Sequence, residues 1–233
     1  LFPFEKKYFD KENIQSTFTG HPLLENYVKS KIDISQIIKN NKKIISIFPG
    51  SRQSEIDVLL PVLIDFIKLM NKKYTNIFYV FHSTSDFNKL IQNKLIKEGF
   101  KNCGSISDEK IKSEVLKSST FAITKSGTIS LEVANAKVPS IIIYKINIIN
   151  FLIVKMLVKV KFANIINIAS NEEIIPELLQ SNCNSKNIFN YVDKYFSNNK
   201  SMQIQIYKSQ KIIESFKTNR STEIAASVLS SRL

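Results

Sequence analysis

Short, almost wholly apolar segments alternate with amphipathic segments along the middle of this chain. The clearest apolar segment is residues 43–48, and three more stand at 77–81, 121–124 and 140–144. Segments with the periodicity of helices lie between and around them, at 55–70, 86–98, 108–118 and 129–136. Near-continuous apolar runs are typical of strands buried on both faces, and crossovers of this length suit parallel pairing. The alternation predicts an α/β fold, with a doubly wound, Rossmann-like parallel sheet.

The remaining parts of the chain have a different pattern. Beyond residue 147 the sequence predicts mainly helices, at 148–158, 171–180, 184–196, 201–216 and 221–230. A short strand over 14–20 and a helix over 23–31 are predicted before the first apolar segment. We therefore expect three parts: residues 1–30 as the end of a preceding domain and a linker, 31–200 as the Rossmann-like domain, and 201–233 as a helical C-terminal tail.

The composition limits the classes of partner and site. The formal net charge of +13 suits nucleic acid, an anionic membrane surface or phosphorylated substrates, but the lysines are scattered, as on ordinary solvated faces. Basic and exposed aromatic residues do not alternate in the way that stacks bases, so we expect no nucleic acid partner. Cys103 and Cys183 make neither a zinc pattern nor a disulfide framework, and the chain has only two histidines. We expect no metal, no cofactor and a reducing, cytoplasmic location.

Residues 147–162 combine apolar positions with Lys155, Lys159 and Lys161. One interpretation is a segment that rests on an anionic bilayer such as the inner membrane. The other, which we favour for most of it, is a buried helix whose lysines extend to solvent. The segment is too polar to span a bilayer.

The turn after residues 43–48 has residues suited to phosphate. Gly50 lets the backbone approach a ligand closely, and free N–H groups at the following helix start favour phosphate oxygens. Ser51 adds a hydroxyl donor, and Arg52 adds a guanidinium suited to bidentate phosphate contact. The alternative is a capped Gly-Ser turn with no ligand, which is common.

The turn after residues 121–124 has the same strand, glycine and helix order. Ser126, Gly127 and Thr128 form the turn, and Glu132 follows Thr128 by four residues, on the same helix face. A carboxylate there can accept both hydroxyls of a ribose while the turn holds phosphates. The alternative is an ordinary first-turn glutamate favoured by the helix dipole.

Considered together, the two turns indicate one ligand, because the carboxyl ends of parallel strands meet at one edge of the sheet. Neither turn has the glycine pattern of a dinucleotide fold or the Gly-Lys-Thr of an ATPase phosphate loop. This favours a nucleotide-sugar over NAD or ATP.

Five fragments in register resemble one family from end to end of the chain. They are Pro3-Phe4-Glu5-Lys6, Gly20-His21-Pro22-Leu23, Pro49-Gly50-Ser51-Arg52 with Glu55, Ser126-Gly127-Thr128 with Leu131-Glu132, and Pro176-Glu177-Leu178-Leu179-Gln180. Their order and spacing resemble lipid-A-disaccharide synthase. The resemblance implies a glycosyltransferase-B fold whose N-terminal domain largely precedes Leu1. It implies transfer of 2,3-diacylglucosamine from UDP-2,3-diacylglucosamine to 2,3-diacylglucosamine 1-phosphate, which releases UDP and forms a β-1,6 disaccharide of lipid A.

The resemblance also implies roles for individual residues. Arg52 and the turn of Gly50 and Ser51 would face the UDP phosphates, with Ser126, Gly127 and Thr128 along the diphosphate and Glu132 on the ribose. Asn167, Glu177 and Gln180 would close the donor pocket, although Ile166 stands where the family usually has Pro. His21 would lie in the cleft near the domain junction as a candidate catalytic residue, with a capped turn as the alternative.

An inverting transfer needs a general base, and the family's base comes from the preceding domain. We therefore expect these 233 residues to bind UDP without turnover. The helical tail is expected to pack on that domain or on a second copy, as in a homodimer. Two alternatives stay open: another UDP-N-acetylglucosamine-dependent transferase or epimerase of similar fold, and a basic nucleic-acid-binding domain.

Overall fold

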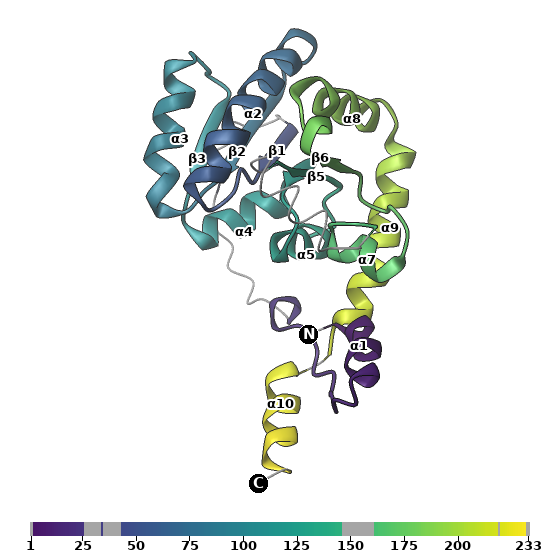
Figure 1. Ribbon diagram of the computed structural model, residues 1–233. Coiled ribbons are helices and arrows are strands. Elements are labelled where there is room, and N and C mark those ends of the chain that lie inside the picture. Colours follow the sequence, from purple (N-terminus) through teal and green to yellow (C-terminus); the bar gives the residue numbers. More distant parts are fainter. Residues whose placement is uncertain (1, 26–33, 35–42, 146–160, 219, 232–233) are drawn as a thin grey trace.

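The computed structural model describes residues 2–25, 34, 43–145, 161–218 and 220–231 (Figure 1). These residues form a six-stranded sheet in the order β3-β2-β1-β4-β5-β6, and every neighbouring pair is parallel. The strands are β1 (Lys43–Ile47), β2 (Ile77–His82), β3 (Cys103–Ile106), β4 (Phe121–Thr124), β5 (Ser140–Tyr144) and β6 (Glu177–Leu179). The strand order and parallel pairing confirm the doubly wound α/β fold.

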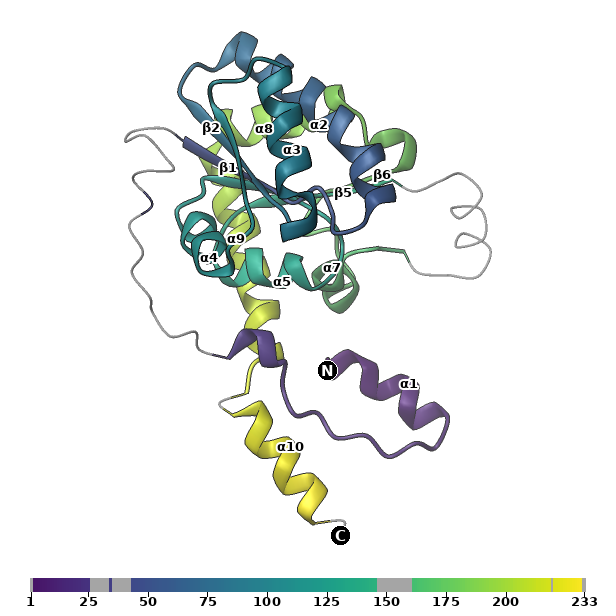
Figure 2. The same ribbon diagram turned by 90° about the vertical axis from the view of Figure 1, so that its left-hand side faces the viewer.

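Helices cover both faces of the sheet (Figure 2). One face carries α2 (Gln53–Lys73), α3 (Ser85–Lys97) and α8 (Ser185–Ser197). The opposite face carries α4 (Glu109–Lys117), α5 (Thr128–Asn135), α7 (Ile165–Ser170) and α9 (Asn199–Phe216). Two short elements at the start of the chain, η1 (Pro3–Glu5) with α1 (Lys6–Lys11), and the last helix, α10 (Ser221–Ser230), lie beyond this layered body.

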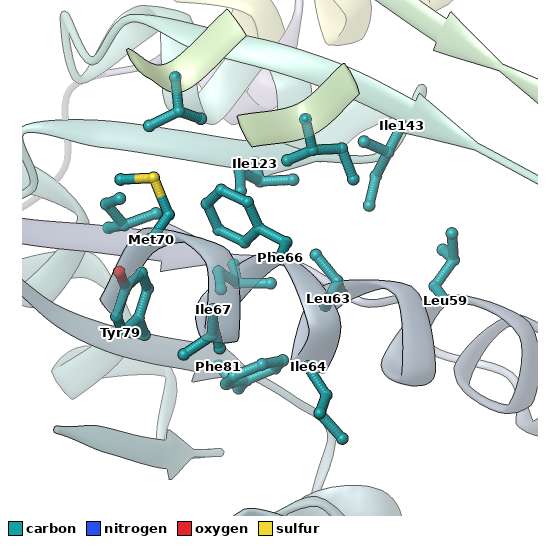
Figure 3. Close-up of a cluster of buried hydrophobic side chains, with 14 of the residues drawn as sticks. Leu59, Leu63, Ile64, Phe66, Ile67, Met70, Tyr79, Phe81, Ile123 and Ile143 are labelled. Carbon is teal, nitrogen blue, oxygen red and sulfur yellow. The ribbon is translucent and has the colours of Figure 1, made fainter. Parts of the chain in front are cut away.

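The largest buried cluster lies between α2 and the sheet (Figure 3). Leu59, Leu63, Phe66, Ile67 and Met70 recur at three- and four-residue intervals, so one face of α2 is apolar over its whole length. All five side chains are fully buried. Each such burial stabilises the fold by about 1.5–3 kcal/mol, which makes α2 a principal anchor of the sheet.

Most predicted elements are confirmed, and the apolar runs over 77–81, 121–124 and 140–144 are strands. The helix predicted over 171–180 is wrong. Residues 165–170 form α7, Asn171 ends it in a left-handed conformation, and Glu177–Leu179 is the edge strand β6. Pairing of β6 with β5 outweighs the helix propensity of Glu and Leu.

Two further differences concern strands. Residues 14–20 have no regular secondary structure and pair with no strand among the described residues, so the strand predicted there is wrong. The strand β3 was not predicted, because Cys103, Gly104 and Ser105 make no apolar run. The helix predicted over residues 148–158 lies outside the described residues. So does most of the helix predicted over 23–31. The described part of that segment begins with the 3₁₀ turn η2 (Pro22–Leu24).

The N-terminal segment is attached to the end of α9. The His21 N–H donates to the Phe216 carbonyl at 3.0 Å, and the Thr218 hydroxyl donates to the Thr19 carbonyl at 2.8 Å. Phe2 lies edge-on against Phe216, with ring centroids 5.0 Å apart. Chain regions almost 200 residues apart in sequence (196 between Glu25 and Ser221) therefore lie side by side.

Candidate functional site

The carboxyl ends of β1 and β4 are neighbours at the middle of the sheet. The chain leaves β1 into α2 on one face, and leaves β4 into α5 on the other. Connections that diverge in this way open a crevice at the strand ends, the usual ligand site of such sheets. A cavity of about 990 Å³ lies here, bordered by the ends of β1, β2 and β4, by α4 and α5, and by residues 23–25. The structure therefore brings the two predicted turns to one cavity.

The first turn contributes Gly50 and Ser51 to the cavity lining. Gly50 has φ +119°, and a Cβ there would lie 2.4 Å from Glu55 Oε2, so the turn requires glycine. The Ser51 N–H donates to that same Oε2 at 3.0 Å, and Lys125 forms an ion pair with Glu55 Oε1 at 2.5 Å. Burial raises the pKa of Glu55, but the bonds from Lys125 and Ser51 outweigh it and hold the pKa below its usual value. This turn is thus held by an internal carboxylate.

Arg52 lies outside the cavity lining. Its side chain is 81% exposed and stands 3.8 Å from Glu55. A long exposed side chain is free to change rotamer, so its contact with phosphate stays a prediction.

The second turn opens directly onto the cavity, with Ser126, Gly127 and Thr128 in the lining. Gly127 has φ +129° and ψ −166°, a conformation reserved for glycine, and a Cβ added there would meet no atom within 4 Å. The Ser126 hydroxyl donates to the Ala163 carbonyl, and the Ser130 hydroxyl donates to the Gly127 carbonyl at 2.7 Å. The start of α5 therefore presents its first N–H groups to the cavity beside a close backbone approach.

Glu132 lies one turn into α5 and lines the same cavity. Burial raises the pKa of its carboxyl, the nearby Glu109 raises it further, and Lys112 opposes both. Within the described part of the chain, no hydrogen bond reaches this carboxylate. Its oxygens are half-buried acceptors in a cavity, which suits a ligand that offers hydroxyl donors.

The predicted residues Asn167, Glu177 and Gln180 are not part of the cavity lining. Asn167 is fully buried, where it accepts the N–H groups of Ile174 and Ile175 at 2.9 Å and donates to Glu177 at 2.8 Å. Glu177 also accepts the N–H of Ala163 at 2.8 Å. Because the Ala163 carbonyl accepts the Ser126 hydroxyl, Asn167 and Glu177 support the second turn from behind. Gln180 has φ +51° and a buried Nε2 with no partner in the described residues.

His21 is buried beside Phe2 and also lies outside the cavity lining. Its Nδ1 accepts the Leu23 N–H at 3.3 Å, so it caps η2. The residues that follow it, Leu23 to Glu25, do border the cavity. This geometry matches the capped turn that the sequence left as an alternative to a catalytic role.

The structure adds lining residues that the sequence did not single out. His82, Ser83 and Thr84 stand at the end of β2, next to β1. The lining also holds five lysines and, besides Glu132, three other glutamates: Lys112, Lys117, Lys125, Lys137 and Lys217 with Glu25, Glu55 and Glu109. The rule that ligands bind at strand ends applied equally to β2, and could have directed attention to His82 and Thr84.

The described residues contain neither a metal site nor a helix that could span a membrane. Groups of three or more His, Cys, Asp or Glu that could hold a metal ion are absent from them. None of the helices that the structure describes is long and apolar enough to cross a membrane.

Known sequences similar to this chain belong to one family of enzymes. A family model described as lipid-A-disaccharide synthetase matches residues 1–229. The chain is 34% identical to lipid-A-disaccharide synthase from Rickettsia prowazekii over 235 aligned residues, which cover 98% of this chain and 61% of that protein. It is also 34% identical to the enzyme from Rickettsia bellii, with 94% and 58% covered. The chain thus spans about three fifths of the length of these relatives.

Solved structures with low sequence identity share the fold. A UDP co-structure of MnaA from S. aureus matches with a TM-score of 0.58 at 14% identity, covering 88% of this chain and 50% of that one. WaaG, a glycosyltransferase involved in lipopolysaccharide biosynthesis, matches with a TM-score of 0.56 at 13% identity, covering 98% and 61%. The C-terminal domain of the glycosyl transferase LpcC from Francisella tularensis matches with a TM-score of 0.52 at 16% identity, covering 78% and 88%. The sheet is therefore of the glycosyltransferase-B type.

Proposed function

This chain belongs to the lipid-A-disaccharide synthase family, and we propose that it is the half that binds the donor nucleotide, the UDP of UDP-2,3-diacylglucosamine. The observation that carries the proposal is the Gly127 turn, which opens α5 into the cavity with Glu132 one helical turn further on. Both groups border the crevice at the carboxyl ends of the neighbouring strands β1 and β4, where the connections to α2 and α5 diverge.

The diphosphate is assigned to the start of α5. The first N–H groups of a helix are free to bind an anion, and the helix dipole adds to their attraction. Ser126 and Thr128 flank Gly127, and Lys125 lies beside them in the lining. Gly50, Ser51 and Arg52 are assigned to the same phosphates from the opposite side, with Arg52 turning inward on binding.

The ribose is assigned to Glu132. A carboxylate with two free oxygens can accept both ribose hydroxyls, and hydrogen bonds to an ionised acceptor are the stronger kind. The raised pKa of Glu132 means that the empty site holds this charge at a cost, which two hydroxyl donors would offset.

The reaction proposed for the whole protein transfers 2,3-diacylglucosamine to 2,3-diacylglucosamine 1-phosphate, forming a β-1,6 linkage in lipid A synthesis. As the glycosidic bond to UDP breaks, negative charge grows on the diphosphate, and the α5 start and the lysines are placed to stabilise it. Asn167 and Glu177 act as positioning residues through Ala163 and Ser126. The residues that bind the acceptor and remove its proton are proposed to lie in the part of the relatives' sequence that this chain does not span. Within the chain, His21 is the proposed candidate for this proton transfer.

The proposal also includes the location of the protein and the packing of its C-terminal helices. Both substrates carry acyl chains, so we place the protein at the cytoplasmic surface of the inner membrane as a peripheral protein. The helices over residues 201–233 are proposed to pack on a preceding domain or on a partner subunit. Three exposed apolar side chains on α9 and α10, Ile204, Tyr207 and Leu229, support this assignment.

Isothermal titration calorimetry with UDP, ADP and uridine tests the proposal. We expect UDP to bind, ADP to bind much more weakly, and Gly127→Ala to abolish most UDP binding because its Cβ would enter the cavity. Gly99→Ala is the matched control: Gly99 also has a positive φ, of +76°, with open space around it, but lies outside the cavity lining. Equal UDP binding by the two variants would refute the assignment of the diphosphate to the Gly127 turn.

Two further titrations test the role of Arg52 and the alternative of a nucleic-acid-binding domain. If Arg52 turns onto the phosphates, Arg52→Ala weakens UDP binding and leaves uridine binding unchanged. Binding of duplex DNA with a steep salt dependence, with no response to UDP, would instead favour a nucleic-acid-binding domain.

A further inference from the structure

At the end of β2, two buried polar side-chain atoms at the cavity have no hydrogen-bond partner among the described residues. Among the described residues, five buried side-chain N or O atoms lack a hydrogen-bond partner, and two of them are His82 Nδ1 and Thr84 Oγ1. Both residues line the cavity, whereas the other three, Tyr79, Asn164 and Gln180, do not. A buried polar atom without a partner costs about 1–3 kcal/mol, so two neighbouring cases in one cavity indicate a missing partner.

The protonation of His82 follows from the hydrogen bonds of its neighbours. The Ser119 hydroxyl donates to the Val115 carbonyl at 2.8 Å, which uses its single proton. Ser46 must therefore donate to Ser119 across their 2.7 Å contact, and His82 Nε2 must donate to Ser46 across theirs, also 2.7 Å. The neutral ring thus carries its proton on Nε2.

His82 also stays neutral at physiological pH. The side chain is only 4% exposed, and burial, with a smaller effect of the nearby Lys112, lowers its pKa to about 3. Its Nδ1 is therefore a bare lone pair that can accept a hydrogen bond and cannot donate one. Phe48 stacks on the ring, with centroids 4.2 Å apart, and keeps it in this orientation.

The hydroxyl of Thr84 lacks the hydrogen bond that is usual for its position. It is the N-cap of α3, where a threonine hydroxyl ordinarily accepts a backbone N–H, yet it makes no capping bond. The N–H groups of Phe87 and Asn88 instead reach the Thr84 backbone carbonyl, at 3.2 and 3.0 Å. With respect to the described residues, the hydroxyl is therefore free both to donate and to accept.

We propose that His82 Nδ1 and Thr84 Oγ1 form a polar subsite that hydrogen-bonds a neutral donor-and-acceptor group of the bound nucleotide. This inference rests on the proposed function, since it assumes that the nucleotide occupies the cavity. His82 accepts from the ligand's donor, and Thr84 bonds the acceptor beside it. A bare lone pair repels phosphate oxygens, and both ribose hydroxyls are already assigned as donors to Glu132, so the subsite belongs to the uracil. The uracil imide, with N3–H between two carbonyls, presents the required donor and acceptor.

The first test observes His82 directly. The chain has two histidines, so ¹⁵N-histidine labelling gives two sets of ring signals. We expect one set with protonated Nε2 and a pyridine-type Nδ1, assigned to His82 by its loss in the variant His82→Phe. UDP should move that Nδ1 signal strongly, while the signals of His21, outside the cavity lining, stay in place. An unmoved His82 Nδ1 in a chain saturated with UDP would overturn the inference.

The second test identifies the ligand group. His82→Phe keeps a planar ring without the acceptor, and Thr84→Val removes only the hydroxyl. Each should weaken UDP binding about five- to tenfold, the usual effect of one hydrogen bond. His82→Asn, whose Oδ1 stands near the place of Nδ1, should recover most of that loss. All variants are compared by thermal unfolding to verify that they fold.

The deciding readout is the choice of analogue. We expect His82→Phe to lose its effect with 3-methyl-UDP, which lacks the N3–H donor. Loss of the effect with 2′-deoxy-UDP or 3′-deoxy-UDP instead would overturn the assignment to the uracil. Wild-type and His82→Phe chains that bind every analogue equally would overturn the subsite while leaving the proposed function intact. A wild-type chain that does not bind UDP at all would refute the proposed function itself.

Discussion

Glu132 is subject to two opposing requirements. Burial and the nearby Glu109 disfavour its charge, whereas a ribose would need that charge as an acceptor. The sequence predicted the position of Glu132 well, because helical spacing from Thr128 fixes its face. It could not predict that the side chains of Asn167 and Glu177 accept backbone N–H groups instead of binding a ligand. Those hydrogen bonds depend on how α7 and β6 meet in space.

Glu132→Gln is expected to stabilise the empty protein and to weaken UDP binding. The raised pKa means that the folded chain binds this proton more readily than the unfolded chain, so the ionised carboxylate costs stability at neutral pH. The amide removes that cost, but it loses about 10- to 100-fold in UDP affinity as charge-assisted bonds disappear. Urea unfolding and UDP calorimetry measure the two effects. Glu223→Gln on the exposed face of α10 is the control, and should change neither.

His82 is expected to make the protein sensitive to acid. Its folded pKa of about 3 lies below the ordinary 6.5, so the unfolded chain takes up a proton that the folded chain refuses. Stability is complete above pH 6.5 and is lost as the pH falls towards 3, by about 1–2 kcal/mol between pH 7 and 5. Urea unfolding of wild type and His82→Phe is measured at both pH values. The difference between the two proteins in their loss of stability is the contribution of His82. The same pH dependence in both proteins would contradict it.

At the scale of elements, the sequence predicted strands where burial on both faces makes a continuous apolar run, as in β1 and β4. It failed at the two edges of the sheet. The edge strand β3 contains Gly104 and half-buried polar residues, and β6 is three residues long within a helix-favouring segment. Such strands exist because a neighbouring strand supplies hydrogen bonds, which is information that a local pattern does not contain.

Asn167→Ala is expected to destabilise the chain by about 2–4 kcal/mol. The side chain holds the N–H groups of Ile174 and Ile175 and donates to the Ile175 carbonyl, so its loss leaves buried groups unpaired. Because these bonds position β6 and Ala163, hydrogen exchange should quicken in the segment from α7 to β6. Asn199→Ala, at an exposed position, is the control. A cost below about 0.5 kcal/mol would show that the loop does not depend on Asn167.

At the scale of the whole molecule, the N-terminal segment and the end of α9 are held together at Gly20. This glycine has φ +91°, and a Cβ there would lie 2.0 Å from Thr218 Oγ1. The motif residues Phe4 and Gly20 to Leu23 therefore have a structural role: through contacts with the end of α9 they place the segment up to Glu25 at the rim of the cavity. The sequence resemblance located these motifs, but only the fold shows that they meet Phe216 and Thr218.

Gly20→Ala is expected to detach the N-terminal segment from α9. The strained conformation alone costs about 1–3 kcal/mol, and the clash with Thr218 adds to it. Gly99→Ala, with a positive φ but open space, measures the conformational cost separately. Limited proteolysis should cut Gly20→Ala within its first 25 residues faster than wild type or Gly99→Ala. Equal cleavage of the two variants would show that the crowding at Thr218 has no effect.

A crystal structure of the chain with UDP tests the central claim most directly. The account predicts diphosphate oxygens within hydrogen-bond distance of the N–H groups at Thr128 and Ile129, and ribose hydroxyls on the Glu132 carboxylate. UDP bound elsewhere, or bound in the cavity without touching α5, would contradict it.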